Sequence, residues 1–331
     1  MYSNLNQLPL SVALWLITDD YKGGSDDPKT ISVTALLRST RQIILSQRVA
    51  VLNKTTPAAS SATSTVIMDV MDKYASRDGQ AFHKAIEDAW LDEERAKKNL
   101  QLLGIPANIA NRLRVNPKSL NKDDIPVYLE QRTEKQIAGW TITGAFDFVM
   151  DGQIQDFKRT STFNYTGKRN DEKYILQGSM YRWLNPQIIT KDSMAIVFLF
   201  KDWTVFKVSQ EGYPSKPIDV RTFPLKSTHQ IEQYILDKIH TLEHHFNTPE
   251  PELPYCTDED LWKDEPKHKY YKSGVIGSRS TRTYDTLAEA RKKFYEDGSV
   301  GLIVPTKMKA KACIYCAAAP VCSQRINEIT E

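Results

Sequence analysis

The apolar residues in the first third of the chain recur with the spacing of helices. An apolar stripe runs through residues 31–50, so this segment is predicted to form one helix. The polar stretch 53–64 is predicted to be a loop, and a second helix is expected over about residues 65–74. A third helix is expected to begin after Gly79. The pattern therefore predicts three helices, the first two separated by one long loop.

From residue 125 the pattern changes to the alternation and short apolar runs that are typical of strands. Four strands are predicted, over residues 127–131, 140–150, 153–159 and 194–200. Further helices are predicted over residues 173–184, 231–245 and 286–295. Strands interleaved with helices predict a fold of the α/β class.

The chain of 331 residues is long for one compact domain and short for three. We expect an N-terminal extension over residues 1–30, a central α/β domain over residues 31–247 and a loop-rich tail over residues 248–331. The extension ends in the breaker-rich segment Gly23–Pro28. The sequence has no apolar run long enough to span a membrane, and its N-terminus lacks the pattern of a signal peptide. These features predict a soluble protein of the cytoplasm.

The net charge of +3 does not by itself indicate a polyanionic partner. Basic residues are nevertheless concentrated between Lys267 and Lys311. This stretch would follow a phosphate backbone, or it would be an ordinary solvated face. Tyr270, Tyr271 and Tyr284 lie among the basic residues, and this combination is expected to contact single-stranded DNA by stacking.

Asp151-Gly152 lies between two predicted strands and is a strong signal for a two-residue hairpin turn. Counting outward from this turn places Asp147 directly opposite Asp156. Opposed side chains lie about 5 Å apart, where two like charges are destabilising. A divalent cation between the carboxylates would offset the repulsion. A slip of one residue in the register would remove this arrangement and leave a surface hairpin with scattered charges.

Lys158 is predicted to share a face with Asp156, because the side chains of a strand point alternately to its two faces. The opposite face carries Phe146, Phe148 and Phe157, which suit a buried core. Two carboxylates and a lysine are the groups that metal-assisted hydrolysis of a phosphodiester needs. The carboxylates hold Mg²⁺ or Mn²⁺, and the lysine orients water or stabilises developing charge.

Two pairs of residues at helical spacing have side chains suited to the same chemistry. His83 and Glu87 share a helix face, and an imidazole ligand suits Mn²⁺ better than Mg²⁺. Gln177 and Tyr181 share a face of the helix after the hairpin, where they would hydrogen-bond a phosphate or the attacking water. Taken singly, the histidine is more often structural, and the second pair is unremarkable on an amphipathic helix.

In their order along the chain, these elements resemble the RecB-like branch of the PD-(D/E)XK nucleases. That branch has a glycine and a histidine on a helix, followed by G-x-x-D, D-x-K and Q-x-x-x-Y. The matching segments are Gly79…His83, Gly144–Asp147, Asp156–Lys158 and Gln177–Tyr181. Residues 31–42 also look like the opening helix of these enzymes. The resemblance covers about residues 30–205, together with the cysteine-containing tail.

The resemblance implies a restriction-endonuclease-like fold, in which a mixed central sheet is flanked by helices. It implies that Mg²⁺ or Mn²⁺ is bound by His83, Asp147, Asp156 and the backbone carbonyl of Phe157. It further implies that the catalytic residues are Lys158, Asp147, Asp156, Gln177 and Tyr181. Among these, Lys158 would be the catalytic lysine, and Gln177 and Tyr181 would help to position the substrate.

The sequence departs from the resembled branch in several places. Arg159 stands where many relatives have a threonine, and we expect this to affect contacts with DNA more than the chemistry. The first cysteine of the iron–sulfur relatives usually lies near the first helix, where this chain has Arg38–Arg41 and no cysteine. Glu87 lies outside the matched motifs and is kept only as a candidate support for His83.

Three of the four cysteines are close together as Cys313-x₂-Cys316-x₅-Cys322. In a cytosolic chain such spacing favours a metal or iron–sulfur site over disulfides. The cluster resembles the iron–sulfur staple of the CRISPR adaptation nucleases and the AddB-type nucleases, with Cys256 as the fourth ligand of a [4Fe–4S] cluster. Zinc on the same cysteines is the main alternative, followed by free thiols or disulfides. Either metal would have a structural role and would tie the tail to the central domain.

The tail also looks like that of phage-encoded RecB-like exonucleases. The resemblance therefore implies a DNA exonuclease that processes linear or single-stranded ends in recombination or replication of phage DNA, in the host cytoplasm. A DNA-binding recombination partner with a weak or unused nuclease site, and a structure-specific endonuclease, are the alternatives. The sequence has no Walker A motif, so a helicase would be a separate partner, as would a single-strand-binding or annealing protein. No membrane partner is expected.

Overall fold

The computed structural model describes residues 2–18, 25, 27–55, 68–263, 265–277 and 279–330. Most of the predicted loop 53–64 and half of the segment Gly23–Pro28 lie outside these residues. Contacts divide the chain into two compact units. In the described part of the chain, unit 1 contains residues 2–37 and 68–241, and unit 2 contains residues 38–55 and 242–330.

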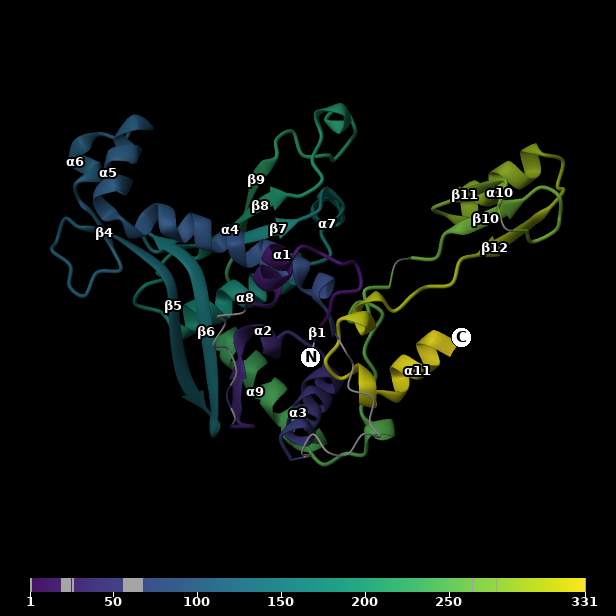
Figure 1. Cartoon of the computed structure of the whole chain (residues 1–331), viewed down its shortest axis with the longest axis horizontal. Helices are drawn as coiled ribbons and strands as arrows, with labels where there is room; N and C mark the ends of the chain where they lie inside the picture. Colours follow the sequence, from purple (N-terminus) through teal and green to yellow (C-terminus); the bar gives the residue numbers. More distant parts are fainter. Residues whose placement is uncertain are drawn as a thin grey trace. The chain divides into compact units, whose positions relative to one another are not determined.

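Unit 1 is built around a seven-stranded mixed sheet with the order β4-β5-β6-β7-β8-β9, in which β2 also pairs with β6 (Figure 1). The strands are β2 (Thr30–Ser32), β4 (Leu113–Val115), β5 (Ile125–Ile137), β6 (Trp140–Met150), β7 (Gln153–Thr160), β8 (Ser193–Phe200) and β9 (Ile218–Pro224). The pairs β2–β6, β4–β5 and β7–β8 are parallel, and the others are antiparallel. A separate parallel pair is formed by β1 (Tyr2–Ser3) and β3 (Met68–Asp69).

The helices of unit 1 follow the order of the predicted elements. They are α1 (Leu10–Ile17), α2 (Val33–Leu36), η1 (Val70–Lys73), α4 (Tyr74–Leu91), α5 (Glu93–Leu102), α6 (Ala107–Ala110), α7 (Thr162–Gly167), α8 (Asp171–Leu184) and η2 (Val205–Lys207). Helix α9 (Thr228–His245) begins in unit 1 and ends in unit 2.

Helices lie on both faces of the sheet of unit 1. Phe157 and Asp156 are neighbours on β7, so their side chains point to opposite faces. Phe157 belongs to an apolar cluster against which Phe82 of α4 packs, whereas Gln177 of α8 donates a hydrogen bond to Asp156. Helices α4 and α8 therefore flank opposite faces. The predicted α/β fold, a mixed sheet flanked by helices, is confirmed.

The predicted hairpin turn is also confirmed. Asp151 and Gly152 have φ values of 48° and 73°, the left-handed conformation that a type I′ turn requires at both positions. Glycine adopts this conformation without steric cost, and aspartate tolerates it. Strands β6 and β7 pair outward from the turn in the expected register as far as Phe148–Gln155.

Unit 2 combines α3 with the C-terminal segments. Its elements are α3 (Thr40–Thr55), η3 (Glu250–Glu252), β10 (His268–Tyr271), β11 (Arg282–Tyr284), α10 (Leu287–Glu296), β12 (Leu302–Pro305), η4 (Lys311–Ile314), η5 (Ala319–Val321) and α11 (Ser323–Thr330). Strand β10 lies between β11 and β12 in an antiparallel sheet, with α10 beside it (Figure 1). Thr286 caps α10 in a capping box with Glu289, which confirms the helix predicted here.

The single helix predicted over residues 31–50 is wrong, because the structure has strand β2 followed by helices α2 and α3. Ser32 caps α2 by accepting a hydrogen bond from the backbone N–H of Ala35 (3.2 Å). Ser39 caps α3 in the same way, through the backbone N–H of Gln42 (3.2 Å). Each capping serine marks the point where one element ends and a new helix begins. Apolar periodicity alone does not reveal such a point.

The second helix, predicted over residues 65–74, is wrong in its described part, and the third helix begins earlier than predicted. The described part of segment 65–74 contains strand β3 and the 3-10 helix η1, which Asp69 and Asp72 cap reciprocally. Helix α4 then begins at Tyr74, so that Gly79 lies within it rather than before it. A glycine inside a helix costs only about 1 kcal/mol and does not have to end the helix.

The expectation that Tyr270 and Tyr271 stack on DNA bases is wrong. Their exposed fractions are 0% and 6%, because both belong to the core of the small sheet. The ring of Tyr270 meets that of Phe294 of α10 edge to face, with 6.5 Å between the centroids. Side chains that are buried in this way hold the sheet and helix together and present no face to a base.

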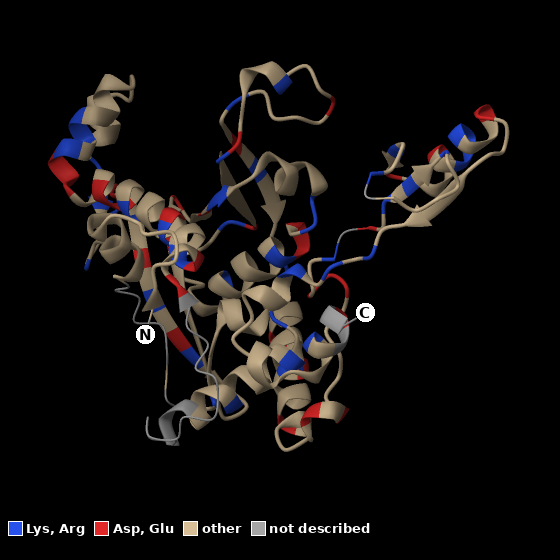
Figure 2. Cartoon of the chain, turned by 45° about the vertical axis from the view of Figure 1, so that its right-hand side comes forward, with Lys and Arg blue, Asp and Glu red and all other residues tan. Residues whose placement is uncertain are grey.

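The basic stretch from Lys267 to Lys311 is interspersed with acidic residues in the structure. Figure 2 shows both charges on the small sheet and on α10. Lys267 lies 2.9 Å from Asp285, and Lys293 lies 3.0 Å from Asp297. Local pairing of this kind weakens the field along the segment. In the described residues, no helix is both long enough and apolar enough to cross a membrane.

Candidate active site

The central feature of unit 1 is a fork in the sheet beside β6. On one edge, β6 pairs with β2 through residues 141–143 and then with β7 through residues 148–150. Asp147 lies between these two pairings, and its Oδ2 accepts a hydrogen bond from the backbone N–H of Phe157 (2.9 Å). The ladder therefore stops short of the expected Asp147–Asp156 pair. Instead of facing Asp156 across a regular ladder, the Asp147 carboxylate fills the gap between the diverging strands.

Gly144 allows α8 to approach the fork closely. A β-carbon at this position would lie 2.8 Å from Leu184 Cδ1 and 3.1 Å from Tyr181 Cε1. Because the side chains of α8 occupy this space, the helix sits directly against β6. The glycine of G-x-x-D thus has a packing role in this chain.

Asp156 and Lys158 lie on the α8 face of β7, as the alternation along the strand predicts. Asp156 has an exposed fraction of 2%, and its Oδ2 lies 2.6 Å from Lys158 Nζ. Gln177 Nε2 donates to Asp156 Oδ1 (3.2 Å) and to the hydroxyl of Tyr181 (3.0 Å). Tyr181 is itself buried, with 4% exposed, so its contact holds Gln177 in place.

His83 reaches the fork from α4. Its Nε2 lies 2.9 Å from the backbone carbonyl oxygen of Phe157, and its Nδ1 lies 3.4 Å from Asp147 Oδ1. Both ring nitrogens therefore face oxygen acceptors, which suits a doubly protonated imidazole. Glu87 does not support His83, because its carboxylate is instead 3.0 Å from Lys84 Nζ.

Glu130 is the residue of this site that the sequence analysis missed. In the register of β5 and β6 it falls opposite Asp147, between the pairs Leu129–Phe148 and Gln131–Phe146. Its φ of 47° is left-handed, an uncommon conformation for a non-glycine residue within a strand. Its Oε1 lies 3.9 Å from His83 Nδ1. Ligand atoms of His83, Glu130 and Asp147 all lie within 4.8 Å of one another, a spacing that suits a metal ion.

The sequence carried only a weak signal for Glu130, because Ala138-Gly139 lacks the Asn or Asp that marks this type of turn. Ala138 and Gly139 form another turn with two positive φ values, 48° and 74°, between β5 and β6. Counting outward from the pair Ile137–Trp140 reaches Glu130 opposite Asp147. The counting that was applied to the Asp151-Gly152 turn finds Glu130 once the Ala138-Gly139 turn is known.

The two cations of the site hold their protons firmly. Burial acts to lower the pKa of His83, but the hydrogen bond and charge of Asp147 outweigh it and raise the pKa to about 9. Burial likewise acts to lower the pKa of Lys158, and the charges of Asp156 and Asp147 hold it above its usual value. The histidine and the lysine are therefore both positively charged at neutral pH.

The carboxylates differ from one another. Burial acts to raise the pKa of Asp147, but the hydrogen bond and charge of His83 hold it below its usual value. Burial raises the pKa of Asp156 to about 6 against the opposing charge of Lys158. Burial, with the neighbouring charge of Asp147, raises the pKa of Glu130 to about 7. Such crowding of acids with shifted pKa values is typical of functional sites.

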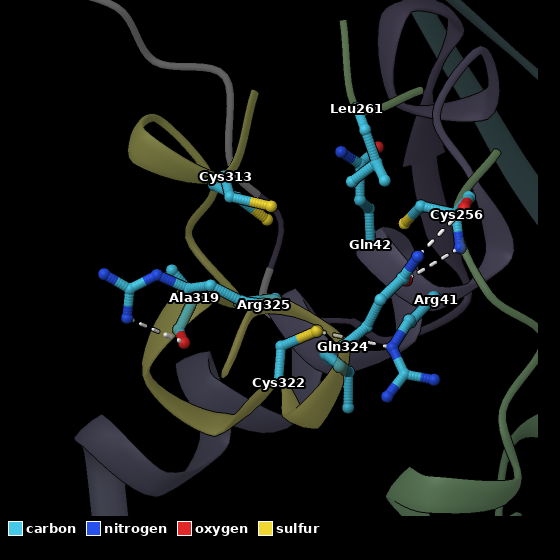
Figure 3. Close-up of a pocket in the computed structure, with 12 residues that line it drawn as sticks. Arg41, Gln42, Cys256, Leu261, Cys313, Ala319, Cys322, Gln324 and Arg325 are labelled. Atoms are coloured by element: carbon cyan, nitrogen blue, oxygen red, sulfur yellow. Dashed lines mark hydrogen bonds between the residues drawn. The ribbon is translucent and has the colours of Figure 1, made fainter. Parts of the chain in front are cut away.

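A second candidate site lies within unit 2. A small hollow is lined by all four cysteines and by the first turns of α3 (Figure 3). The cysteines, which are Cys256, Cys313, Cys316 and Cys322, are half-buried and form no disulfide. Burial raises the pKa of Cys256 to about 11 and also raises that of Cys313. The structure thus gathers sulfur atoms from distant parts of the sequence around one space.

The sequence matches no protein-family model and no curated protein. Among solved structures, the chain is similar to the protein SSO0001, with a TM-score of 0.38 and 15% identity, over 70% of this chain and 84% of that chain. It is also similar to a phage-related exonuclease from Haemophilus somnus 129PT, with a TM-score of 0.24 and 17% identity, over 35% of this chain and 57% of that chain. Both TM-scores are below 0.5, so neither likeness supports a conclusion about this chain.

Proposed function

We propose that this protein is a metal-dependent phosphodiesterase whose active site is the fork between β6 and β7. The observation that carries the proposal is the convergence of Asp147, Asp156, Lys158 and His83 on that fork, from two strands and a helix. Oxygen and imidazole donors of this kind suit Mg²⁺ or Mn²⁺. More particularly, we propose a DNA exonuclease that processes linear ends, and this step rests on the ordered motifs of the RecB-like nucleases.

The donor set fits a divalent cation in one further respect. Ligand atoms of His83, Glu130 and Asp147 lie within 4.8 Å of one another, so they are close enough to share one ion. Carboxylates at this spacing repel one another when ionised, and a divalent cation between them would offset that repulsion. His83, Asp147, Asp156 and the carbonyl oxygen of Phe157 would hold the ion, and Glu130 offers one more oxygen.

Each residue around the ion has a role that follows from its contacts. When bound, Mg²⁺ or Mn²⁺ would stabilise negative charge on the phosphate and lower the pKa of bound water. Lys158 is an ammonium fixed beside Asp156, so it would stabilise charge on a phosphate oxygen rather than accept a proton. Gln177, anchored on Tyr181, would keep the Asp156 carboxylate oriented.

A nuclease assay with linear and circular DNA tests the proposal. Purified protein should degrade linear DNA with Mn²⁺ or Mg²⁺ and not with EDTA, and it should spare closed circles. Asp156→Asn and Lys158→Ala should each lower the rate by at least about 100-fold. Asp192→Asn, at a side chain that is 97% exposed, is the matched control and should have no effect.

Each result of this assay separates the proposal from an alternative. Cleavage of closed circles would indicate an endonuclease. DNA binding without hydrolysis under any metal condition would indicate a recombination partner with an unused site. Full activity of Asp156→Asn would disprove the assigned chemistry.

We propose further that the four cysteines of unit 2 hold a [4Fe–4S] cluster, with zinc as the alternative. Four free thiols around one hollow supply the thiolates that either metal needs. Zinc sites with four cysteines more often use two C-x-x-C pairs, and this sequence has only one, so the cysteine spacing favours the cluster. Visible absorbance together with iron, sulfide and zinc analysis of purified protein distinguishes the two.

A further inference from the structure

The start of α3 forms one wall of the cysteine hollow. Arg41 and Gln42, in the first turn of this helix, line the hollow together with the four cysteines (Figure 3). Arg41 has an exposed fraction of 1%, and its Nε donates a hydrogen bond to Cys322 Sγ (3.3 Å). A fully buried arginine that points an N–H group at a sulfur is unusual, and it calls for a reason.

The guanidinium of Arg41 is held so that it cannot turn away from the sulfur. Its other nitrogens donate to the carbonyl oxygen of Leu253 (2.9 Å), to Ser323 Oγ (3.1 Å) and to the Glu250 carboxylate. Because these acceptors fix the plane of the group, the Nε–H is aimed at Cys322. A donor of this kind interacts more strongly with a thiolate than with a neutral thiol.

Ser39 plays a corresponding part at Cys256. Its Oγ lies 3.1 Å from Cys256 Sγ and accepts the backbone N–H of Gln42. The Gln42 side chain in turn accepts the backbone N–H of Ser39 (3.3 Å), which completes a capping box. A metal-bound cysteine has no proton to donate, so in that state the Ser39 hydroxyl must donate to the sulfur.

The backbone of Cys256 is located independently of its sulfur. Gln324, with 6% exposed, accepts the backbone N–H of Cys256 (2.9 Å) and donates to its carbonyl oxygen (3.0 Å) (Figure 3). This clamp joins the segment before β10 to the start of α11. Replacement of the sulfur alone should therefore leave the surrounding backbone in place.

We infer that the first turn of α3 is a built part of the cysteine metal site, in which Ser39 and Arg41 are positioning residues for the sulfurs of Cys256 and Cys322. This inference rests on the proposed metal site. Because Ser39 Oγ lies beside Cys256 Sγ, a sulfur placed at residue 39 would reach the same part of the hollow. The fourth cysteine ligand can then be moved from residue 256 to residue 39.

The test moves that ligand. Cys256→Ser should lower the bound iron, sulfide or zinc to half of the wild-type content or less. Adding Ser39→Cys to this variant should restore the metal content and the visible spectrum, at the cost of a weaker helix cap. Adding Thr40→Cys instead is the matched control and should restore neither. Among the described residues, Ser39 Oγ lies 3.1 Å from Cys256 Sγ, whereas no hydrogen bond joins Thr40 to a cysteine sulfur.

The outcomes separate the inference from the proposed site. If the wild-type protein holds no metal, either as purified or after reconstitution, the proposed metal site is disproved. A metal-binding wild type whose Cys256→Ser variant stays fully loaded would remove Cys256 from the proposed ligands, and the inference with it. Equal rescue by Thr40→Cys and Ser39→Cys would overturn only the inference. Failure of rescue in a double variant that is folded by circular dichroism would also overturn it.

A second measurement covers the case in which the double variants do not fold. Arg41→Lys keeps the charge and removes the directed Nε–H group, so metal should leave to a chelator roughly tenfold faster or more. Arg325→Lys is the matched control, because Arg325 lines the same hollow but donates to the carbonyl oxygen of Ala319. Equal release rates for both variants would contradict a positioning role for Arg41.

Discussion

At the residue scale, the fork between β6 and β7 holds more negative than positive groups. Asp147, Asp156 and Glu130 supply three carboxyls, and His83 and Lys158 supply two cations. The imbalance is met by protons, since the pKa values of Asp156 and Glu130 are raised to about 6 and about 7. A divalent cation would replace these protons and that of His83.

This competition predicts that Mn²⁺ binding strengthens as pH rises from 6 to 9. The ion needs ionised carboxylates and a neutral imidazole, and the corresponding pKa values in the metal-free protein are about 6, about 7 and about 9. Affinity should rise roughly tenfold per pH unit for each proton displaced. Calorimetry across this range measures the effect. A constant affinity would contradict the assignment of His83 as a ligand, and His83→Ala should flatten the dependence above pH 7.

Glu130→Gln tests whether the missed carboxylate belongs to the metal site. Loss of one oxygen ligand or of its charge should raise the Mn²⁺ concentration for half-maximal activity by about 10- to 100-fold, with KM for DNA little changed. Glu134→Gln, at the same residue type on the same strand, is the control. An unchanged metal requirement would show that Glu130 is not a metal ligand. Its left-handed conformation would then reflect local strand geometry alone.

At the scale of elements, two close approaches decide how the site is assembled. Helix α8 lies against β6 at Gly144, and helix α4 brings His83 to the carbonyl oxygen of Phe157. The first approach depends on the absence of a side chain. Gly79, the glycine of the motif that contains His83, has no such packing role, because a β-carbon there would meet nothing within 4 Å.

Gly144→Ala should therefore destabilise the protein and disturb the site. The added methyl would crowd Leu184 and Tyr181, and overpacking of this kind costs about 1–3 kcal/mol. A shift of Tyr181 would also release Gln177, so the nuclease rate should fall. Urea unfolding and the DNA assay measure both effects. Gly79→Ala is the control and should stabilise helix α4 by up to about 1 kcal/mol; equal behaviour of the two variants would refute the packing argument.

At the scale of the whole molecule, the chain builds two units from interleaved segments. Residues 38–55 lie between two parts of unit 1 in the sequence, yet they belong to unit 2 with residues 242–330. The hollow with four cysteines joins α3, the segment around Cys256 and the C-terminal turns within that unit. A metal bound there would link segments that are far apart in sequence.

Removal of the cysteine-bound metal should selectively destabilise unit 2. Structural metal sites contribute directly to folding free energy, whereas the core of unit 1 is formed by its own sheet. Hydrogen exchange before and after chelation should show lost protection in α3 and α11, with that of β6 and β7 retained. Unchanged protection of α3 and α11 would show that the cysteines are not a structural site.

The sequence by itself determined the elements whose pattern is local. The strands β6 to β8, the Asp151-Gly152 turn and the alternation that puts Asp156 and Lys158 on one face follow from short-range rules of backbone geometry. The order of the motifs also sufficed to propose the chemistry. The breaks at Ser32 and Ser39 were missed because side-chain caps overrode an apolar period.

Only the tertiary structure decided where the strands part and what enters the gap. Along one edge of β6 the pairing partner changes from β2 to β7, and this depends on segments that are far apart in the sequence. As a result, Asp147 accepts a hydrogen bond from Phe157 instead of facing Asp156 in a ladder. The same holds for Ser39, which meets Cys256 from the other end of the unit. Local patterns fix the direction of a side chain, whereas its partner depends on packing between segments that the sequence keeps apart.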